Sequence, residues 1–154
     1  MAAKAVEGRN VKSGSLGPSG RTEAADARER AKDFLTTAEV GRLLDATRAG
    51  RHGVRDYLLV LMMYRHGLRV SEAIALRRDE VDLAASRLWV RRLKNGLSVE
   101  QPMAGDELRA TKRYLATRGD ELPWLFVSER GAPMTRQAVN HLLVQAAARA
   151  GLSP

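Results

Sequence analysis

The longest apolar run of the chain, YLLVLMMY at residues 57–64, has no polar face when it is drawn on a helical wheel. A helix that is apolar all round is buried among other elements, so the pattern predicts a central helix over residues 54–66. Gly67 follows directly, and glycine often ends a helix. A shorter helix with apolar positions on one side is expected over residues 70–78.

Three further helices are indicated by apolar residues at helical spacing. The first lies in FLTTAEVGRLLDATR at residues 34–48, where Thr36 and Glu39 have the spacing of a capping box. The second covers residues 105–117, and the third covers residues 135–150 and begins at a capping threonine. The residues of the third helix expected to face the core are Val139, Leu142, Leu143 and Ala146.

The pattern changes from helical to β-favouring in RLWVRRLKNGLSVEQPM at residues 87–103. Short β-favouring runs lie on either side of Asn95-Gly96, a dipeptide typical of a tight hairpin turn. The apolar stretch WLFV at residues 124–127 indicates a short strand or a buried extended segment. Together with the helices, these segments predict a mostly α-helical fold with one small antiparallel β-hairpin or sheet.

Residues 1–33 differ from the rest of the chain in composition. They are rich in glycine, serine and charged residues and contain almost no large apolar side chain. Such a segment cannot bury enough surface to offset the entropy lost on ordering, so a flexible tail is expected, with a short helix over residues 22–32 as an option. Residues 34–154 are expected to form the domain.

Lysine and arginine outnumber aspartate and glutamate by 26 to 18, which gives a formal charge of +8 and a pI near 10.6. Residues 1–33 contribute +2 and the remaining residues contribute +6, so the expected domain is itself basic. This excess favours a nucleic acid or another polyanion as partner, because cations that neutralise phosphates release bound counterions. A soluble protein with an arginine-rich surface explains the same charge, and charge alone does not separate the two.

The chain contains no cysteine and three histidines. Disulfides, thiolate metal sites and cysteine nucleophiles are therefore excluded, and a histidine-rich metal site is not expected. The longest apolar run is too short to span a bilayer, and the first residues lack the apolar core of a signal peptide. The expected location is the cytoplasm, where a basic protein can associate with the nucleoid.

The sequence YRHGLRVSE at residues 64–72 places Arg69 just after the predicted helix end, with Glu72 three residues later. A guanidinium offers a planar fork of donors that matches two phosphate oxygens, and Glu72 could hold that fork in place. The alternative is a solvated ion pair at helical spacing, which contributes roughly 0.2–0.5 kcal/mol. The two residues alone do not decide between these interpretations.

Three basic residues, Arg91, Arg92 and Lys94, lie beside the predicted hairpin turn. One interpretation is a hairpin in which Lys94 presents its ammonium group to a phosphate or a leaving oxygen, while Arg91 and Arg92 add contacts to a DNA backbone. The other interpretation is that these charges protect the strand edge and keep the hairpin soluble.

The three tyrosines are weak candidates for a nucleophile. Tyr57 and Tyr64 lie one heptad apart on the apolar helix and are expected to pack in the core, each with its hydroxyl reaching a polar partner. Tyr114 lies among basic residues on an amphipathic helix and is expected to be half-buried.

Taken in order over residues 34–154, these stretches resemble the catalytic domain of the tyrosine recombinase (phage integrase) family. The matching pieces are FLTTAEVGRLLDATR, RDYLLVLMMYRHGLRVSEAIALRRDEVDL, RLWVRRLKNGLSVEQPM and WLFVSERGAPMTRQAVNHLLVQAAARAGLSP. Within the family, the chain resembles in particular the small recombinases that invert fimbrial switch DNA and lack a separate core-binding domain. The resemblance implies double-stranded DNA and other recombinase protomers as partners, and chemistry that needs neither metal nor cofactor.

Members of this family cut DNA with a tyrosine that attacks a phosphodiester, which leaves a 3′-phosphotyrosyl link and a 5′-hydroxyl. By the resemblance, Arg69 in HGLRVSE matches the first catalytic arginine, which stabilises the charge of the pentavalent transition state. Lys94 in RRLKNG matches the catalytic lysine, which protonates the leaving oxygen. Glu72 matches the acidic residue that supports the arginine.

One part of the family pattern has no match. After a helix like residues 135–150, the family continues into a His-x-x-Arg motif, then a histidine or tryptophan, and then the tyrosine nucleophile, whereas here the helix is followed by GLSP. The expectation is therefore a C-terminally truncated recombinase without independent activity. Two alternatives stay open: a non-catalytic remnant that binds DNA or recombinases, and a basic regulator in which residues 54–78 form a helix-turn-helix.

Overall fold

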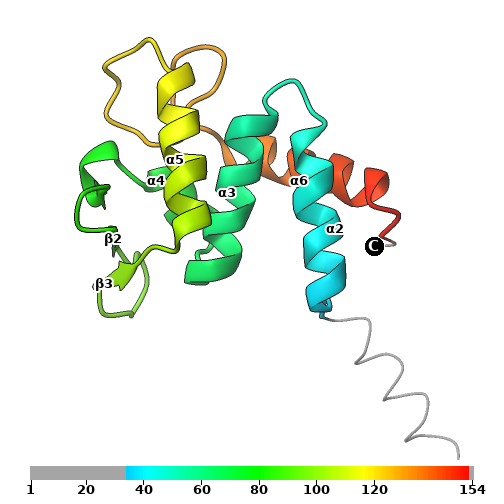
Figure 1. Cartoon of the computed structure of the whole chain (residues 1–154), viewed down its shortest axis with the longest axis horizontal. Helices are drawn as coiled ribbons and strands as arrows, with labels where there is room; N and C mark the ends of the chain where they lie inside the picture. Colours follow the sequence, from blue (N-terminus) through cyan, green and yellow to red (C-terminus); the bar gives the residue numbers. More distant parts are fainter. Residues whose placement is uncertain (1–33, 153–154) are drawn as a thin grey trace, which may run out of the picture. The chain divides into compact units, whose positions relative to one another are not determined.

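The computed structural model describes residues 34–152. The expected tail and its short helix lie outside these residues, and the part of the chain from Thr36 onward forms one compact unit. The predicted class, mostly helical with a small antiparallel sheet, is confirmed (Figure 1). The elements are α2 (Thr37–Arg48), α3 (Gly53–His66), α4 (Val70–Ala75), a 3₁₀ helix (Arg78–Glu80), β1 (Val81–Asp82), β2 (Arg87–Val90), β3 (Val99–Pro102), α5 (Gly105–Thr117) and α6 (Arg136–Arg149).

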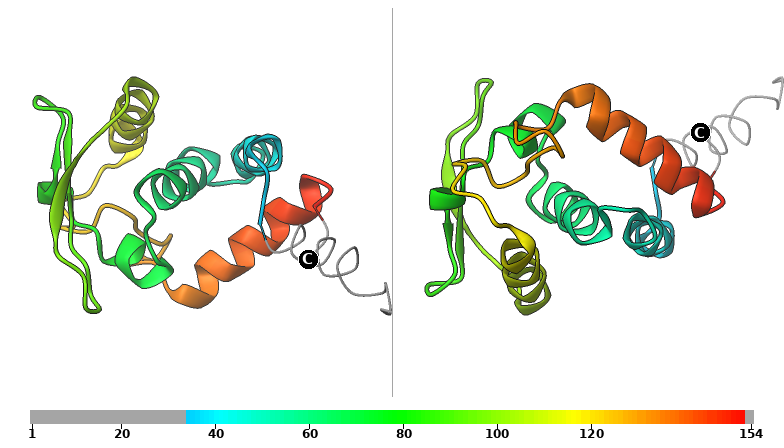
Figure 2. Two further views of the ribbon diagram at one scale, coloured as in Figure 1. Left: turned by 90° about the horizontal axis from the view of Figure 1, so that it is seen from below. Right: turned by 90° about the horizontal axis from the view of Figure 1, so that it is seen from above.

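The central helix is α3, as its apolar pattern predicts. The side chains of residues 58–62 are all buried, and α2 and α5 pack along this helix (Figure 2). Gly67 ends α3 with a φ of +59°, in the left-handed conformation that glycine adopts at low cost. Neither α3 nor any other helix in the described part of the chain is long and apolar enough to cross a membrane.

The sheet has the strand order β1-β2-β3, and neighbouring strands are antiparallel. Along β2, the buried residues Leu88 and Val90 alternate with the exposed residues Arg87 and Trp89, so one face of the sheet packs against the core. The sequence pattern did not predict β1, because a strand of two residues is too short to show alternation.

The expected hairpin is formed by β2 and β3, but its connection is longer than a tight turn. The paired strands end at Val90 and Val99, so Asn95-Gly96 lies inside a loop of residues 91–98, called here the hairpin loop. Within this loop the backbone N–H of Arg92 donates to the hydroxyl of Ser98 at 3.3 Å. The two strands therefore separate before they reach the dipeptide.

Helix α4 ends at Ala75, three residues before the predicted end at residue 78. Leu76 is extended, and its carbonyl accepts the backbone N–H of Leu125 at 2.8 Å. This partner is distant in sequence, so helical spacing could not reveal where the helix ends. A helix of six residues whose middle is buried is poorly suited to reading a DNA groove, which argues against the helix-turn-helix alternative.

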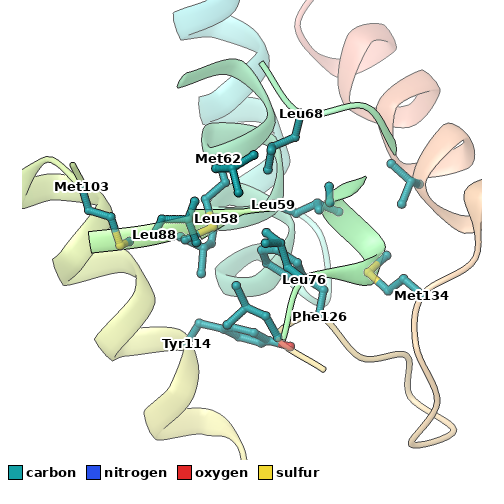
Figure 3. Close-up of a cluster of buried hydrophobic side chains, with 14 residues drawn as sticks. Leu58, Leu59, Met62, Leu68, Leu76, Leu88, Met103, Tyr114, Phe126 and Met134 are labelled. Carbon is teal, nitrogen blue, oxygen red and sulfur yellow. The ribbon is translucent and has the colours of Figure 1, made fainter. Parts of the chain in front are cut away.

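The main core joins side chains from α3, α4, β2, α5 and α6 (Figure 3). Phe126 is the largest fully buried side chain, and its ring stacks on Tyr114 with 5.9 Å between centroids. Within residues 124–127, Leu125 and Phe126 are buried but lie in bends between the isolated bridges of Trp124 and Val127, so the expected strand or extended segment is a bent piece of the core. A smaller cluster, built around Leu43, Val60 and Ala146, joins α2, α3 and α6.

Four glutamates repeat one local arrangement at the starts of helices. In each case the carboxylate accepts the backbone N–H of the residue three positions earlier; the pairs are Thr36–Glu39, Arg69–Glu72, Arg77–Glu80 and Ala104–Glu107. This bond satisfies a donor that the start of a helix leaves unpaired and places a negative charge at its positive end. Glu72, Glu80 and Glu107 are buried, with exposures of 4%, 9% and 1%.

Candidate functional site

A cavity of about 640 Å³ lies where α4, the hairpin loop and the start of α6 meet. Its three cationic residues are Arg69, Lys94 and Arg136, and the rest of its lining consists of Met63, Leu68, Val70 and Ser71. Among residues 34–152, no carboxylate lies within ion-pair distance of these three cations. The fold thus brings Arg69 and Lys94, which are far apart in sequence, into one cavity, called here the cationic cavity.

Each of the three cations is placed by the boundary of an element. Arg69 is the residue before α4, and Lys94 lies in the hairpin loop. Arg136 is the first residue of α6 and follows Thr135, whose hydroxyl accepts the backbone N–H of Ala138 at 3.1 Å. The positive end of the α6 dipole therefore lies beside the cationic cavity.

Glu72 supports Arg69 through the backbone. Its Oε2 accepts two hydrogen bonds, one from the backbone N–H of Arg69 and one from Nη1 of Arg92, each at 2.9 Å. The sequence suggested that Glu72 would hold the Arg69 guanidinium, but its charged partner is Arg92. The N–H of Arg69, followed by Arg92, lowers the pKa of the Glu72 carboxyl even though burial opposes this. The backbone at Arg69 is therefore fixed at the edge of the cavity that this residue lines.

Arg92 ties the hairpin loop to the end of α3. Besides its bond to the carboxylate, Nη1 donates to the carbonyl of Gly67 at 3.0 Å, and Nη2 donates to the carbonyl of His66 at 3.0 Å. The last carbonyls of a helix have no partner within it, so the guanidinium satisfies acceptors that would otherwise need water. Lys94 is two residues further along the loop, so this anchor also restricts where Lys94 lies.

Arg91 is more exposed than its neighbour, with 58% of its side chain accessible against 23% for Arg92. Its Nη2 lies 2.7 Å from Oε1 of the buried Glu80. Much of the Arg91 side chain is exposed to solvent, where an external anion can reach it, whereas the guanidinium of Arg92 is engaged within the protein.

At the end of α3, His66 belongs to a buried network. Its Nδ1 lies 2.7 Å from Oε1 of Gln101, and its Nε2 lies 2.8 Å from Oε1 of Glu107. Burial lowers the pKa of His66, but the bonds to Glu107 and Gln101 outweigh burial and raise it. Burial raises the pKa of Glu107, yet His66 and the N–H of Ala104 leave it lowered. This network of His66, Gln101 and Glu107 links α3, β3 and α5.

Arg136 and His66 were not identified as site residues from the sequence, although the distance of each from a core residue along its helix was an indication. Arg136 lies three residues before the buried Val139, and His66 lies four residues after the buried Met62, so each shares a helix side with a core residue. No group of three or more potential metal ligands occurs within residues 34–152.

None of the three tyrosines lines the cationic cavity. Tyr57 packs against Arg48, whose guanidinium carbon lies 3.9 Å from the ring centroid. Tyr114 is buried more deeply than expected, and its hydroxyl accepts the backbone N–H of Val127 at 3.4 Å. Tyr64 is 54% exposed, so the expectation that it packs in the core is wrong.

His-x-x-Arg spacings occur in this chain at residues 52–55 and 66–69, before the helix that precedes this motif in the family. The first histidine, His52, has its Nε2 2.5 Å from Oε1 of Glu129. The second is the buried His66 of the network described above. Both histidines make internal contacts, so neither spacing replaces the family's motif.

Comparison with known proteins identifies relatives over most of the chain. The model of the Phage integrase family matches residues 33–154. The type 1 fimbriae regulatory protein FimB of Escherichia coli K12 is 37% identical over 131 residues, and FimE of the same strain is 37% identical over 123 residues. The tyrosine recombinase XerA of Thermococcus kodakarensis is 41% identical over 99 residues.

The crystal structure of a XerA recombinase superposes with a TM-score of 0.67 and 27% sequence identity, covering 79% of this chain and 44% of that one. The aligned regions cover 82% of this chain and 66% of FimB, 77% of this chain and 62% of FimE, and 62% of this chain and 33% of the T. kodakarensis XerA. The chain therefore spans less than two thirds of the length of each of these relatives.

Proposed function

Because the chain belongs to the phage integrase family, we propose that it binds double-stranded DNA and that the cationic cavity holds one backbone phosphate. The observation that carries this proposal is the meeting of three cations, from three separate elements, in one cavity without a carboxylate. Such a set neutralises a phosphodiester and releases its counterions. The process we propose is site-specific recombination by strand breakage and rejoining.

In this proposal, Arg69 binds the non-bridging oxygens of the phosphate at which the strand breaks. Its guanidinium fork matches two oxygens and stabilises the extra charge of the transition state. Lys94 donates a proton to the leaving 5′ oxygen. Arg136 adds a third positive charge to the cavity.

The proposal gives the other polar residues supporting roles. Glu72 fixes the backbone at Arg69, and Arg92 fixes the hairpin loop that carries Lys94. Arg91 contacts a neighbouring backbone phosphate through its exposed side. The DNA contact expected for Arg92 is replaced by a positioning role, because its donors bind two carbonyls and a buried carboxylate.

By itself, this chain is proposed to bind DNA without cutting it. A phosphotyrosyl link requires a tyrosine hydroxyl at the phosphate, and no tyrosine lines the cationic cavity. Recombination would then use a tyrosine from outside the described residues, for example from another recombinase protomer. Action on DNA would place the protein in the cytoplasm, at the nucleoid.

Binding is tested by fluorescence anisotropy of a labelled duplex over a series of salt concentrations. Arg69→Ala should weaken binding and reduce the slope of log K against log salt by about 1, because one phosphate contact is lost. Arg42→Ala is the matched control, since Arg42 lies on α2, is 56% exposed and does not line the cavity. Equal affinities for Arg69→Ala and the wild type, with both proteins folded by circular dichroism, would contradict the proposal.

Cleavage is tested with a nicked duplex that traps any covalent intermediate, followed by a denaturing gel. We expect no protein–DNA adduct from this chain alone. A stable adduct that disappears when Tyr57, Tyr64 or Tyr114 is replaced by phenylalanine would show that one of them is a nucleophile, and the proposal of binding without cleavage would be wrong.

A further inference from the structure

A second basic cavity, of about 450 Å³, lies between α2 and α5 over the first turns of α3. Tyr57 and Val54 of α3 line it, with Arg48 on the α2 side and Arg109 and Arg113 on the α5 side. Both views of Figure 2 show α5, α3 and α2 side by side, with α6 on the opposite side of α3. This cavity, called here the α5 groove, shares no lining residue with the cationic cavity.

The charge of the α5 groove is poorly balanced. Its one carboxylate, Asp106, is bound by both terminal nitrogens of Arg65, which lies outside the lining and lowers the pKa of that carboxyl. Arg109 and Arg113 are four residues apart on α5, and like charges at this spacing destabilise a helix slightly. Within the described part of the chain, neither arginine has a carboxylate partner at ion-pair distance. An anion would remove this repulsion.

The other side of the groove carries a guanidinium over an aromatic ring. The guanidinium of Arg48 lies over the ring of Tyr57, 3.9 Å from its centroid. The Arg48 side chain is 57% exposed, and its ion pair with the exposed Asp45 is long, at 3.7 Å, so this pair holds it weakly. A guanidinium stacked on an aromatic ring presents its other face to a planar group, and nucleobases stack on guanidinium planes.

From these features we propose that the α5 groove binds a free nucleotide. The base stacks on Arg48 above Tyr57, and the phosphates bind the forks of Arg109 and Arg113. The volume of the groove falls within the range of about 300–1,000 Å³ typical of small-molecule sites. A free nucleotide fits better than a duplex, because the bases of a duplex are stacked on one another and cannot stack on Arg48. The inference is independent of the proposed function of the cationic cavity.

Calorimetric titration of the full chain with ATP tests this inference. Arg113→Glu should weaken ATP binding about tenfold or more, because a charge-assisted bond becomes a repulsion. Lys112→Glu is the matched control, because it makes the same charge change at the exposed residue directly before Arg113, which does not line the groove. It should change the affinity for ATP less than about twofold. Arg69→Ala should bind ATP like the wild type.

A second pair of titrations separates base stacking from charge. Arg48→Lys keeps the charge but removes the planar surface, so it should weaken ATP binding and leave inorganic tripolyphosphate binding unchanged. Three results would overturn the inference. The folded wild type could fail to bind ATP, or Arg113→Glu and Lys112→Glu could lose equal affinity for ATP. The third result is that Arg113→Glu weakens binding of duplex DNA but not of ATP. Unfolding curves for each variant confirm that the comparison is between folded proteins.

Discussion

Replacing Arg92 by alanine should lower the free energy of unfolding by about 2–3 kcal/mol. The guanidinium donates to the carbonyls of His66 and Gly67 and to the carboxylate of Glu72, whose side chain is 2% exposed. Without it, Glu72 is a buried charge that keeps the backbone N–H of Arg69 as its hydrogen-bond donor. Breaking a fully buried ion pair costs about 3–5 kcal/mol, and the value expected here is smaller because Arg92 is 23% exposed.

Urea unfolding followed by circular dichroism measures this loss, and a double-mutant cycle with Glu72→Gln isolates the charge. In the Glu72→Gln background, Arg92→Ala should cost about 1 kcal/mol less than in the wild type, because no buried carboxylate is left uncompensated. Arg42→Ala is the control: the Arg42 side chain is 56% exposed and its ion pair with the partly exposed Glu39 is long, at 3.9 Å, so its loss should cost about 0–1 kcal/mol.

The pH dependence of the same pair has a defined sign. The folded-state pKa of Glu72 is lowered, so its contribution to stability is present above the ordinary value of 4.5 and is lost as pH falls through the folded-state pKa. The reasoning would be refuted if Arg92→Ala and Arg42→Ala unfolded at the same urea concentration, or if the cost of Arg92→Ala were unchanged by Glu72→Gln.

Three other substitutions test separate parts of the fold. Phe126→Ala should lower the free energy of unfolding in urea by about 3–5 kcal/mol, because it leaves a cavity at the centre of the core. Leu97→Ala is the control and should cost close to nothing, because the Leu97 side chain is 92% exposed. Similar costs for the two substitutions would show that Phe126 is not at the centre of the core. Thr36→Ala should cost about 1 kcal/mol by removing the cap of α2, and an unchanged melting temperature would disprove the capping role. The pKa of His66 is raised, so its pair with Glu107 stabilises the fold fully below pH 6.5 and less as pH rises through the folded-state pKa. The urea midpoint of the wild type should therefore fall with rising pH, and that of His66→Gln should change less. Parallel curves for the two proteins would contradict a charged His66–Glu107 pair.

Elements set by local chemistry could be predicted from the sequence. The apolar run of α3, the cap of α2 and the left-handed glycine at residue 67 each depend on neighbours within a few positions. The end of α4 depends on a backbone partner distant in sequence, because Leu76 pairs with Leu125, and β1 is too short to show alternation, so no local pattern shows either feature. The hairpin could be predicted, but the length of its loop could not.

The candidate site follows the same division. The resemblance to the tyrosine recombinase family identified Arg69 and Lys94 as candidate catalytic residues, and the fold places both in one cavity. The partner of Glu72 could not be predicted, because Arg69 at i−3 and Arg92 on a distant loop are equally compatible with the sequence. Residue types alone also do not show that Arg91 is more exposed to solvent than Arg92, because this depends on the direction of each side chain after the end of the strand.

The burial of three capping glutamates changes how the formal charge of the chain should be understood. Glu72, Glu80 and Glu107 count against the excess of lysine and arginine, yet their carboxylates lie inside the protein, against backbone N–H groups and basic side chains. A polyanion that touches the folded protein meets more positive charge, relative to negative, than the value of +8 suggests. Unfolding exposes the three carboxylates to solvent. An anionic matrix such as heparin should therefore retain the native chain more strongly than the denatured chain, although the formal charge of the two is identical.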